Sequence, residues 1–477
     1  MATWRGFFIV LLLSCGAIGA PAQTTNSDAI DQYVLAEMGR QHIPGLALGI
    51  YRNGKIERAK GYGLANIELD VAVKPETIFQ SGSVGKQFTA TAIMMLVEEG
   101  KVGLDDSVRK YFPEAPETWQ NVKIKNLLSH TSGLSEYESA DKTKPGGPIN
   151  LRADVSEDEL VKIIETFPMD FQPGEKWSYR NTNYVLLGVI IHKLTGKFYG
   201  DFLQERVFQP LGMKSTRIIS EADIIPNRSA GYQLVKGEWK NQDWVSPSFN
   251  STADGALYFN VVDLAKWDEA LYSERLLKRS SFDQLWTVFK LNDGKPNSAN
   301  YGMAWEINDV NGHKIIEHGG AWQGFTTHIA RYVDDKLTVV VLTNLDSAHS
   351  SPGKIAHHVA GLENAALMPP EKKAIEDKEP QITGKLRVIV EQFARGKANP
   401  EDFTPKVRSK LFPDEAKELQ QALSDFGPLE SFALIGHEAG AVRHYTYRVK
   451  YRDTSIQMEF LLDEQGLVDG MELKDDE

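Results

Sequence analysis

Apolar and polar positions recur with two different periods along the chain, and the change of period predicts the order of its elements. Near the N-terminus, apolar residues at helical spacing predict an amphipathic helix over 28–40. Two strands are expected next, over 46–51 and 56–63, joined by an Asn-Gly hairpin dipeptide. The middle, about 84–266, has mainly helical patterns separated by long polar loops. The first half of the chain therefore predicts mixed α and β structure.

Strand patterns return after this helical middle. Strands at both ends of a region with helices between them predict one antiparallel sheet built from the two ends of that region. A binding cleft would then lie at the seam between the sheet and the helices. The later strands are expected over 302–307, 314–317, 326–332 and 337–342.

A shift to charged and Pro-rich composition over 366–380 predicts a linker. It separates a main domain, 25–365, from a C-terminal domain, 381–477. The pattern of the second domain predicts helices followed by strands. The alternation over 443–451 predicts one strand with a solvent-exposed face. The fold class expected is therefore multi-domain α+β, and the C-terminal part is similar to cystatin-like or nuclear-transport-factor-like folds.

The first residues have the pattern of a secretion signal, 1–22: Arg5, a short apolar run, then small residues. The run is too short to span a bilayer. Cleavage is expected after Ala20 or Ala22, and the protein is expected to be secreted or periplasmic. The only cysteine, Cys15, lies within this signal. An imperfect lipobox around Cys15 leaves a lipid-anchored form as the alternative.

Composition excludes several classes of function. The chain has 477 residues, of which 42% are hydrophobic and 25% charged, enough for two domains with proper cores. Its formal net charge of −12 argues against nucleic-acid binding. It contains no phosphate-cradling Gly-rich loop and no basic tract. No cofactor is expected.

The most informative chemical motif is Ser83-Val84-Gly85-Lys86, which places a hydroxyl and an amine one helical turn apart. A serine becomes a good nucleophile only when a nearby base takes its proton. Roughly two chance Ser-x-x-Lys matches are expected in a chain of this length. The alternative to a catalytic role is that Ser83 caps a helix and Lys86 is solvated. Only this match precedes a long apolar helix, over 88–97; the others are Ser107/Lys110, Ser139/Lys142 and Ser351/Lys354.

Two further segments favour the catalytic reading. Tyr179-Arg180-Asn181 stands at the mouth of a second apolar helix, after a Pro-Gly turn. Further on, a predicted strand reaches His318 and continues into Gly319-Gly320, which have no side chains. Such a glycine pair is expected where a ligand lies against the backbone. Each of these motifs is weak alone, and together they point to one site.

In this order and spacing the segments resemble the serine β-lactamase and penicillin-binding-protein superfamily. The branch indicated contains class C β-lactamases, DD-peptidases, D-aminopeptidases and esterases. The resemblance covers about residues 28–362 and includes the flanking phrase Leu127-Leu128-Ser129-His130-Thr131-Ser132-Gly133-Leu134. It is specific for the superfamily and uninformative about substrate. It implies a β-lactamase/transpeptidase-like fold and an acyl-enzyme mechanism.

The resemblance also implies roles for individual residues. Ser83 would be the acylated nucleophile, Lys86 its hydrogen-bonded base, and Tyr179 a proton-sharing acid. Backbone N–H groups of Ser83 and Ala321 would form the oxyanion hole. Burial is expected to lower the pKa of Lys86. The substrate-binding residues implied are Asn181, His318, Gly319, Gly320 and Ala321.

One departure from the family pattern concerns the substrate. Many β-lactamases have Lys where this chain has His318, and a mostly neutral imidazole does not supply the fixed positive charge that attracts a drug carboxylate. Efficient penicillinase activity is therefore disfavoured, while peptide substrates remain open. A structural strand histidine is the alternative for His318. Arg180 is expected to point to solvent.

Other chemistries find little support. The stretch around Ser83 does not match the Gly-x-Ser-x-Gly nucleophile elbow. No His-Glu-x-x-His occurs, and the adjacent His357 and His358 diverge on a helix, so shared metal ligation by that pair is not expected. No metal ligand is assigned. His130 lies in a polar turn, where shaping the loop is favoured over a triad role.

The sequence therefore predicts a secreted serine hydrolase that forms an acyl-enzyme on Ser83 and cleaves an ester or an amide. A DD-peptidase or D-aminopeptidase acting on cell-wall-type peptides is one alternative. A catalytically silent protein that binds cell-wall or partner ligands is another. The partner expected is a small molecule or a peptide, and the oligomeric state is open.

Overall fold

The computed structural model describes residues 26–138, 149–347, 350–368, 370, 372–438, 440, 442–452 and 455–475. The expected signal over 1–22, with Cys15, lies outside the described residues. So do Ser139 and Lys142 of one chance motif. None of the helices in the described ranges is long and apolar enough to cross a membrane.

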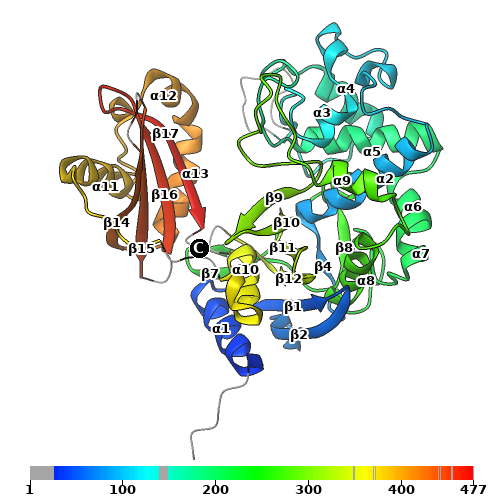
Figure 1. The fold of residues 1–477 in the computed structure, drawn as a ribbon, viewed down its shortest axis with the longest axis horizontal. Helices are drawn as coiled ribbons and strands as arrows, with labels where there is room; N and C mark the ends of the chain where they lie inside the picture. Colours follow the sequence, from blue (N-terminus) through cyan, green and yellow to red (C-terminus); the bar gives the residue numbers. More distant parts are fainter. Residues whose placement is uncertain are drawn as a thin grey trace, which may run out of the picture.

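The main domain is organised around a seven-stranded sheet (Figure 1). Its strands are β1 (Gly45–Arg52), β2 (Lys55–Asn66), β3 (Val71–Ala72), β9 (Glu306–Val310), β10 (His313–Trp322), β11 (Phe325–Tyr332) and β12 (Leu337–Thr343). Their order is β3-β2-β1-β12-β11-β10-β9, and all the pairings are antiparallel. Leu46 of β1 lies opposite Thr343 of β12. The sheet is thus built from the two ends of the domain, as the sequence predicts.

Helices cover both faces of this sheet. On one face, α1 (Asn26–Arg40) and α10 (Pro352–Glu363) pack on a core that includes Ile50, Val339 and Val359. On the other face lies the larger helical region, whose core joins Ala47 and Val340 of the sheet to the buried helices. Successive residues of a strand point to opposite faces, so an apolar run such as β12 can serve both cores.

The helical region contains the segment that carries Ser83. The 3₁₀ turn η1 (Gly82–Gly85) runs directly into α2, in which every residue from Lys86 to Leu96 is buried. This confirms the expectation of a helix at the centre of the domain. The helices here are α2 (Lys86–Glu98), α3 (Ile124–Leu128), α4 (Glu157–Glu165), α5 (Asn181–Thr195), α6 (Tyr199–Leu203), α7 (Gln209–Leu211), α8 (Val261–Leu271) and α9 (Arg279–Leu285).

Two small sheets accompany the helices, and they give the middle of the chain more strand than its sequence predicts. One has the order β4-β8-β5 and the other the order β13-β6-β7. Their strands are β4 (Phe79–Gln80), β5 (Arg217–Ile218), β6 (Tyr232–Val235), β7 (Glu238–Asn241), β8 (Leu257–Phe259) and β13 (Leu345–Asp346).

One predicted strand boundary is wrong. The strand expected over 302–307 begins only at Glu306 and continues to Val310. Before it the chain turns back on itself, because Gly302 N–H donates to Trp305 O and Ala304 has a φ of 65°. A left-handed residue cannot continue a strand, and the apolar run here fills the core as a turn.

The C-terminal domain is a four-stranded antiparallel sheet covered by three helices. Along β15, Tyr445, Tyr447, Val449 and Tyr451 are buried, which confirms the predicted alternation. In Figure 1 this domain lies beside β9 and α10 of the main domain. Its elements are α11 (Pro380–Ala394), α12 (Pro405–Leu411), α13 (Asp414–Asp425), β14 (Leu429–Glu438), β15 (Arg443–Tyr451), β16 (Ser455–Leu462) and β17 (Val468–Asp475).

Candidate active site

Ser83 lies in the 3₁₀ turn η1, at the mouth of a hollow between the helical region and β10. The alternative interpretation, in which Ser83 serves as a helix cap, is wrong. The cap positions of η1 and α2 are occupied by Ser81 and Gly85, and no side chain caps either helix. Ser83 is half-buried and its side chain remains available to the hollow.

Lys86 lies one turn further on and is fully buried. Its Nζ is 3.0 Å from Ser83 Oγ and 2.8 Å from Asn181 Oδ1, and it also donates to the backbone carbonyl of Asp254. Burial lowers the pKa of Lys86 from 10.5 to about 8, and nearby carboxylates offset only part of this effect. An amine with this pKa is partly neutral at mildly alkaline pH and can then accept a proton from a hydroxyl.

The aromatic ring of Tyr179 lies against the amine of Lys86. Its ring centroid is 4.9 Å from Lys86 Nζ, and its buried hydroxyl has no hydrogen-bond partner of ordinary geometry among the described residues. Burial raises the pKa of Tyr179 well above its ordinary value, although the nearby Ser83 hydroxyl partly opposes the shift. Tyr179 therefore stays protonated and can donate a hydrogen bond into the hollow.

Asn181 is the first residue of α5, so its position is fixed by the start of a buried helix. Its backbone N–H donates to Glu136 at 2.6 Å, which satisfies one of the free N–H groups at that helix end. Its side-chain oxygen accepts from Lys86. Ser83, Lys86, Tyr179 and Asn181 thus converge on one small volume, as the sequence predicts.

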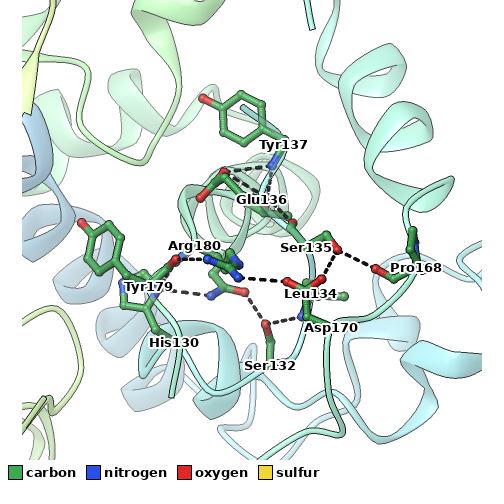
Figure 2. Close-up of polar contacts among 12 residues, drawn as sticks. His130, Ser132, Leu134, Ser135, Glu136, Tyr137, Pro168, Asp170, Tyr179 and Arg180 are labelled. Carbon is green, nitrogen blue, oxygen red and sulfur yellow. Dashed lines mark hydrogen bonds and ion pairs between the residues drawn. The ribbon is translucent and has the colours of Figure 1, made fainter. Parts of the chain in front are cut away.

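His130 holds the Tyr179 segment in place (Figure 2). Its Nδ1 accepts from Arg180 N–H at 3.2 Å and from Asn183 Nδ2 at 3.1 Å. Its ring lies 4.2 Å from the ring of Tyr179. Burial lowers the pKa of His130 well below its ordinary value, so it is neutral with the proton on Nε2. This geometry agrees with the loop-shaping role favoured from sequence.

Arg180 does not point freely to solvent, contrary to expectation. It pairs with Asp170 at 3.0 Å and donates to the carbonyl of Tyr179, and its side chain is only 28% exposed (Figure 2). The pair joins two parts of the single loop that connects α4 to α5. Local sequence gives no sign of a partner ten residues upstream in an irregular segment.

His318 lies on β10 at the opposite wall of the site. Its Nε2 is 2.9 Å from the hydroxyl of Tyr301, and its Nδ1 meets the carbonyl of Gly319. Burial lowers the pKa of His318 to about 3. The imidazole is therefore neutral, and this position carries no fixed positive charge.

Gly319, Gly320 and Ala321 bring the backbone of β10 against the Ser83 turn. A Cβ added to Gly320 would lie 2.9 Å from Ser83 N, and one added to Gly82 would lie 2.5 Å from Ala321 N. Glycine at both positions lets the two chains approach this closely. The N–H groups of Ser83 and Ala321 are thereby placed in the same narrow space.

Three acidic residues at the site were not found from sequence. Glu136 and Glu138 lie beside Asn181, and Asp254 joins them through the hydroxyl of Tyr137, which meets both Glu138 and Asp254. Burial and repulsion from Asp254 raise the pKa of Glu138 to about 7. Glu136 closely follows the phrase around His130, which could have drawn attention to it. Asp254 directly precedes Gly255-Ala256-Leu257-Tyr258, a further phrase that resembles the family, which could have drawn attention to it.

The hollow in front of Ser83 opens into a cavity of about 1120 Å³. Its walls come from both domains, since Ser83, Tyr179 and His318 of the main domain share it with Lys372 and Gln457. The last two residues contact each other at 3.0 Å. A cavity of this size accommodates a peptide-sized ligand.

The beta-lactamase family profile matches residues 30–362. That is more than half of the chain, and the chain belongs to this family. A curated penicillin-binding protein of Bacillus subtilis (strain 168) is 29% identical over 330 residues, which cover 66% of this chain and 71% of that protein. The resemblance identified from sequence, to serine hydrolases of the β-lactamase and penicillin-binding-protein class, is confirmed.

Two solved structures share the fold. The octameric penicillin-binding protein homologue from Pyrococcus abyssi matches with a TM-score of 0.63 and 23% identity, over 94% of this chain and 100% of that one. A D-stereospecific amidohydrolase from a Streptomyces species matches with a TM-score of 0.58 and 25% identity, over 70% of this chain and 98% of that one. The predicted β-lactamase/transpeptidase-like fold with an added α+β domain is confirmed.

Proposed function

We propose that this protein hydrolyses an amide or ester bond through an acyl-enzyme on Ser83. The observation that carries the proposal is the 3.0 Å contact between Ser83 Oγ and the buried Lys86 Nζ, together with the lowered Lys86 pKa. A serine beside an amine that can be neutral is an activated nucleophile. The closely placed N–H groups of Ser83 and Ala321 support an oxyanion hole.

The reaction divides into two halves. Neutral Lys86 takes the Ser83 hydroxyl proton while Oγ bonds to the substrate carbonyl carbon, and the N–H groups of Ser83 and Ala321 hold the oxyanion. The proton then passes by way of Tyr179 to the leaving nitrogen or oxygen as its bond to carbon breaks. A water molecule next attacks the acyl carbon while Lys86 takes its proton. Lys86 passes this proton to Ser83 Oγ as the acyl C–O bond breaks, which releases the acid and restores both the hydroxyl and the neutral amine.

A labelled fluorophosphonate tests this assignment directly. It should modify the wild-type protein at Ser83 and leave Ser83→Ala unmodified. Ser107→Ala is the matched control, because Ser107 and Lys110 repeat the spacing while Ser107 caps a short helix and donates to the carbonyl of Gln120. Labelling of Ser83→Ala at the wild-type rate would contradict the proposal. Absence of labelling in the wild type would support the silent binding protein instead.

A second, finer candidate is a hydrolase of amine-bearing peptides or D-amino-acid amides. Glu136, Glu138 and Asp254 gather three carboxylates around one lysine, and His318 is neutral. A substrate ammonium would favour the ionised form of Glu138, whereas a carboxylate placed there would be repelled. The likeness to a D-stereospecific amidohydrolase adds support.

Paired substrates separate the two candidates. The amine-directed reading expects D-phenylalanine amide to be cleaved with a higher kcat/KM than its N-acetylated form, and Glu138→Gln to reduce this preference. A general esterase would cleave p-nitrophenyl acetate well and treat both amides alike. Faster cleavage of the N-acetylated amide would contradict the amine-directed reading. The export signal expected over 1–22 supports the further proposal that this activity is located outside the cytoplasm.

A further inference from the structure

A cluster of three potential metal ligands lies on the face of β10 that looks away from Ser83. Glu317 Oε2 is 2.6 Å from His357 Nε2 and 2.9 Å from His328 Nε2. The three ligand atoms all lie within 4.8 Å of one another. Each residue comes from a different element: β10, β11 and α10. The cluster is therefore created by tertiary structure.

The sheet register explains why these side chains meet. His328 on β11 lies opposite Gly319 on β10, and Glu317 is two residues along the same strand, on the same face. A side chain at Gly319 or at Gly353 of α10 would lie 3.5 Å or 3.2 Å from His328 Nδ1. The two glycines leave His328 room to lean diagonally toward Glu317.

The carboxylate is oriented by a further contact. Glu317 Oε1 accepts from Asn308 Nδ2 at 2.7 Å, which directs Oε2 toward the two imidazoles. The Glu317 side chain is 4% exposed, and those of His328 and His357 are 13% and 11% exposed. Such an outer hydrogen bond to a carboxylate ligand is typical of metal sites, where it fixes the ligand orientation.

We propose that Glu317, His328 and His357 bind one Zn²⁺ ion. Two imidazole nitrogens and one carboxylate oxygen form a ligand set that Zn²⁺ takes with a fourth position open to water. The set contains too few oxygens for Mg²⁺ or Ca²⁺. Glu317, His328 and His357 also line the large cavity, so an ion and its water have a path to the site. Ligand atoms about 2.0–2.1 Å from one tetrahedral ion lie roughly 3.3 Å apart. Zn²⁺ binding therefore requires the Glu317–His357 contact to widen by about 0.7 Å and the Glu317–His328 contact by about 0.4 Å.

The ion would act separately from the serine chemistry. Glu317 and His318 are neighbours on one strand, and their side chains point to opposite faces of the sheet. Zn²⁺ would tie β10 and β11 to α10 behind the wall that carries His318. Sequence gives no sign of the site, because the ligands are 11 and 40 residues from Glu317 and share no ligand motif. The adjacent His358 is not part of it, since its ring stacks on Tyr33 at 3.8 Å.

Calorimetric titration of the tag-free, chelator-treated protein with Zn²⁺ tests the proposal. We expect one equivalent of Zn²⁺ to bind and to raise the melting temperature. Mg²⁺ should produce neither effect. Co²⁺ in place of Zn²⁺ should give the visible absorption of a four-coordinate ion. These measurements on the wild-type protein require no variant to fold.

Two variants then locate the ion. His328→Asn and Glu317→Gln should each weaken Zn²⁺ binding by more than about 100-fold, because loss of a direct ligand costs more than loss of an outer partner. His313→Asn is the matched control. His313 lies on β10, as Glu317 does, and its Nδ1 is 2.8 Å from Asp335 Oδ2, with no second imidazole in that pair. It should bind Zn²⁺ as the wild type does.

Two results would overturn the proposal. One is a wild-type protein that takes up no Zn²⁺ beyond the level of His328→Asn. The other is undiminished binding in both His328→Asn and Glu317→Gln, which would place the ion elsewhere. In either case the three residues would be a hydrogen-bonded carboxylate and imidazole network only. Neither result affects fluorophosphonate labelling of Ser83.

Discussion

Two fully buried cations occupy very different surroundings in the main domain. Lys86 on α2 meets only uncharged oxygens directly: a hydroxyl, a side-chain amide and a backbone carbonyl. Arg331 on β11 pairs with the buried Asp268 at 2.7 Å and lies over the ring of Tyr272, 4.7 Å from its centroid. One cation lacks a directly paired negative charge, and the other has one.

The difference agrees with the base role proposed for Lys86 and with a structural role for Arg331. A buried ammonium without a contacting carboxylate is costly, and Lys86 responds with a pKa lowered to about 8 by burial. Asp268 accepts from both Arg331 and Thr338, which links α8 to β11 and β12. Lys86, which is proposed to release its proton, has no carboxylate in direct contact, whereas Arg331, which joins elements, has one.

The largest effect is expected from Lys86→Met. Removal of the base should lower kcat/KM for p-nitrophenyl acetate by about 100- to 10,000-fold, the usual contribution of a positioned base. Steady-state kinetics measure this loss. Lys110→Met, at the second Ser-x-x-Lys match, removes a lysine that is 58% exposed and should leave kcat/KM unchanged. Equal losses of kcat/KM in the two variants would show that the buried position of Lys86 has no special role in the reaction.

Arg331→Met should act on stability. It leaves Asp268 charged, buried and without its cation, and is expected to cost about 3–5 kcal/mol of unfolding free energy. Denaturant titration measures the change. Arg387→Met, which removes an exposed pair with Glu391 on α11, should cost less than about 0.5 kcal/mol. The double change Arg331→Met with Asp268→Leu should recover much of the loss, and a double variant as unstable as Arg331→Met would contradict this account.

Lys86→Met should have the opposite effect on stability. Since the folded protein binds this proton with a pKa of about 8 and the unfolded chain with one near 10.5, the unfolded state holds more protons between these values. Stability is therefore lost as the pH falls through this window, and below it the loss stays at roughly 3 kcal/mol. Lys86→Met removes that cost.

Denaturant titrations at several pH values measure this effect. At pH 7 the variant should be more stable than the wild type by up to roughly 3 kcal/mol. The gain should shrink as the pH rises and vanish above about 10.5. A variant that is less stable than the wild type at pH 7 would show that Lys86 is held as a favourable cation. The wild-type kcat/KM should also fall about tenfold per pH unit below 8 if neutral Lys86 is the base.

Local patterns predicted much of the fold. The alternating and helical periods placed α1, the β1–β2 hairpin, α2 and the C-terminal strands, because burial of one face leaves a periodic trace in sequence. The start of the strand expected over 302–307 was wrong, because the apolar residues before Glu306 are buried in a turn. The short strands of the two small sheets carry too few residues for any period to be visible.

The candidate site was predictable only where residues form short motifs. Ser83 and Lys86 are one turn apart, and Tyr179 and Asn181 flank a helix start, so these side chains could be proposed from sequence. Asp254 reaches Lys86 through a backbone carbonyl, which any residue could supply. Tyr301 meets His318 only because a turn precedes β9. Such contacts depend on tertiary structure and leave no local pattern.

The pairing of β1 with β12 has a consequence for how the protein is made. These central strands come from opposite ends of the family domain, and neither can complete the sheet without the other. A nascent chain that has just emerged past α2 already carries Ser83 and Lys86 but lacks the β10 backbone against which Ser83 is placed. Reactivity of the serine should therefore arise late, once the ribosome has released β12 and the distant segments have docked.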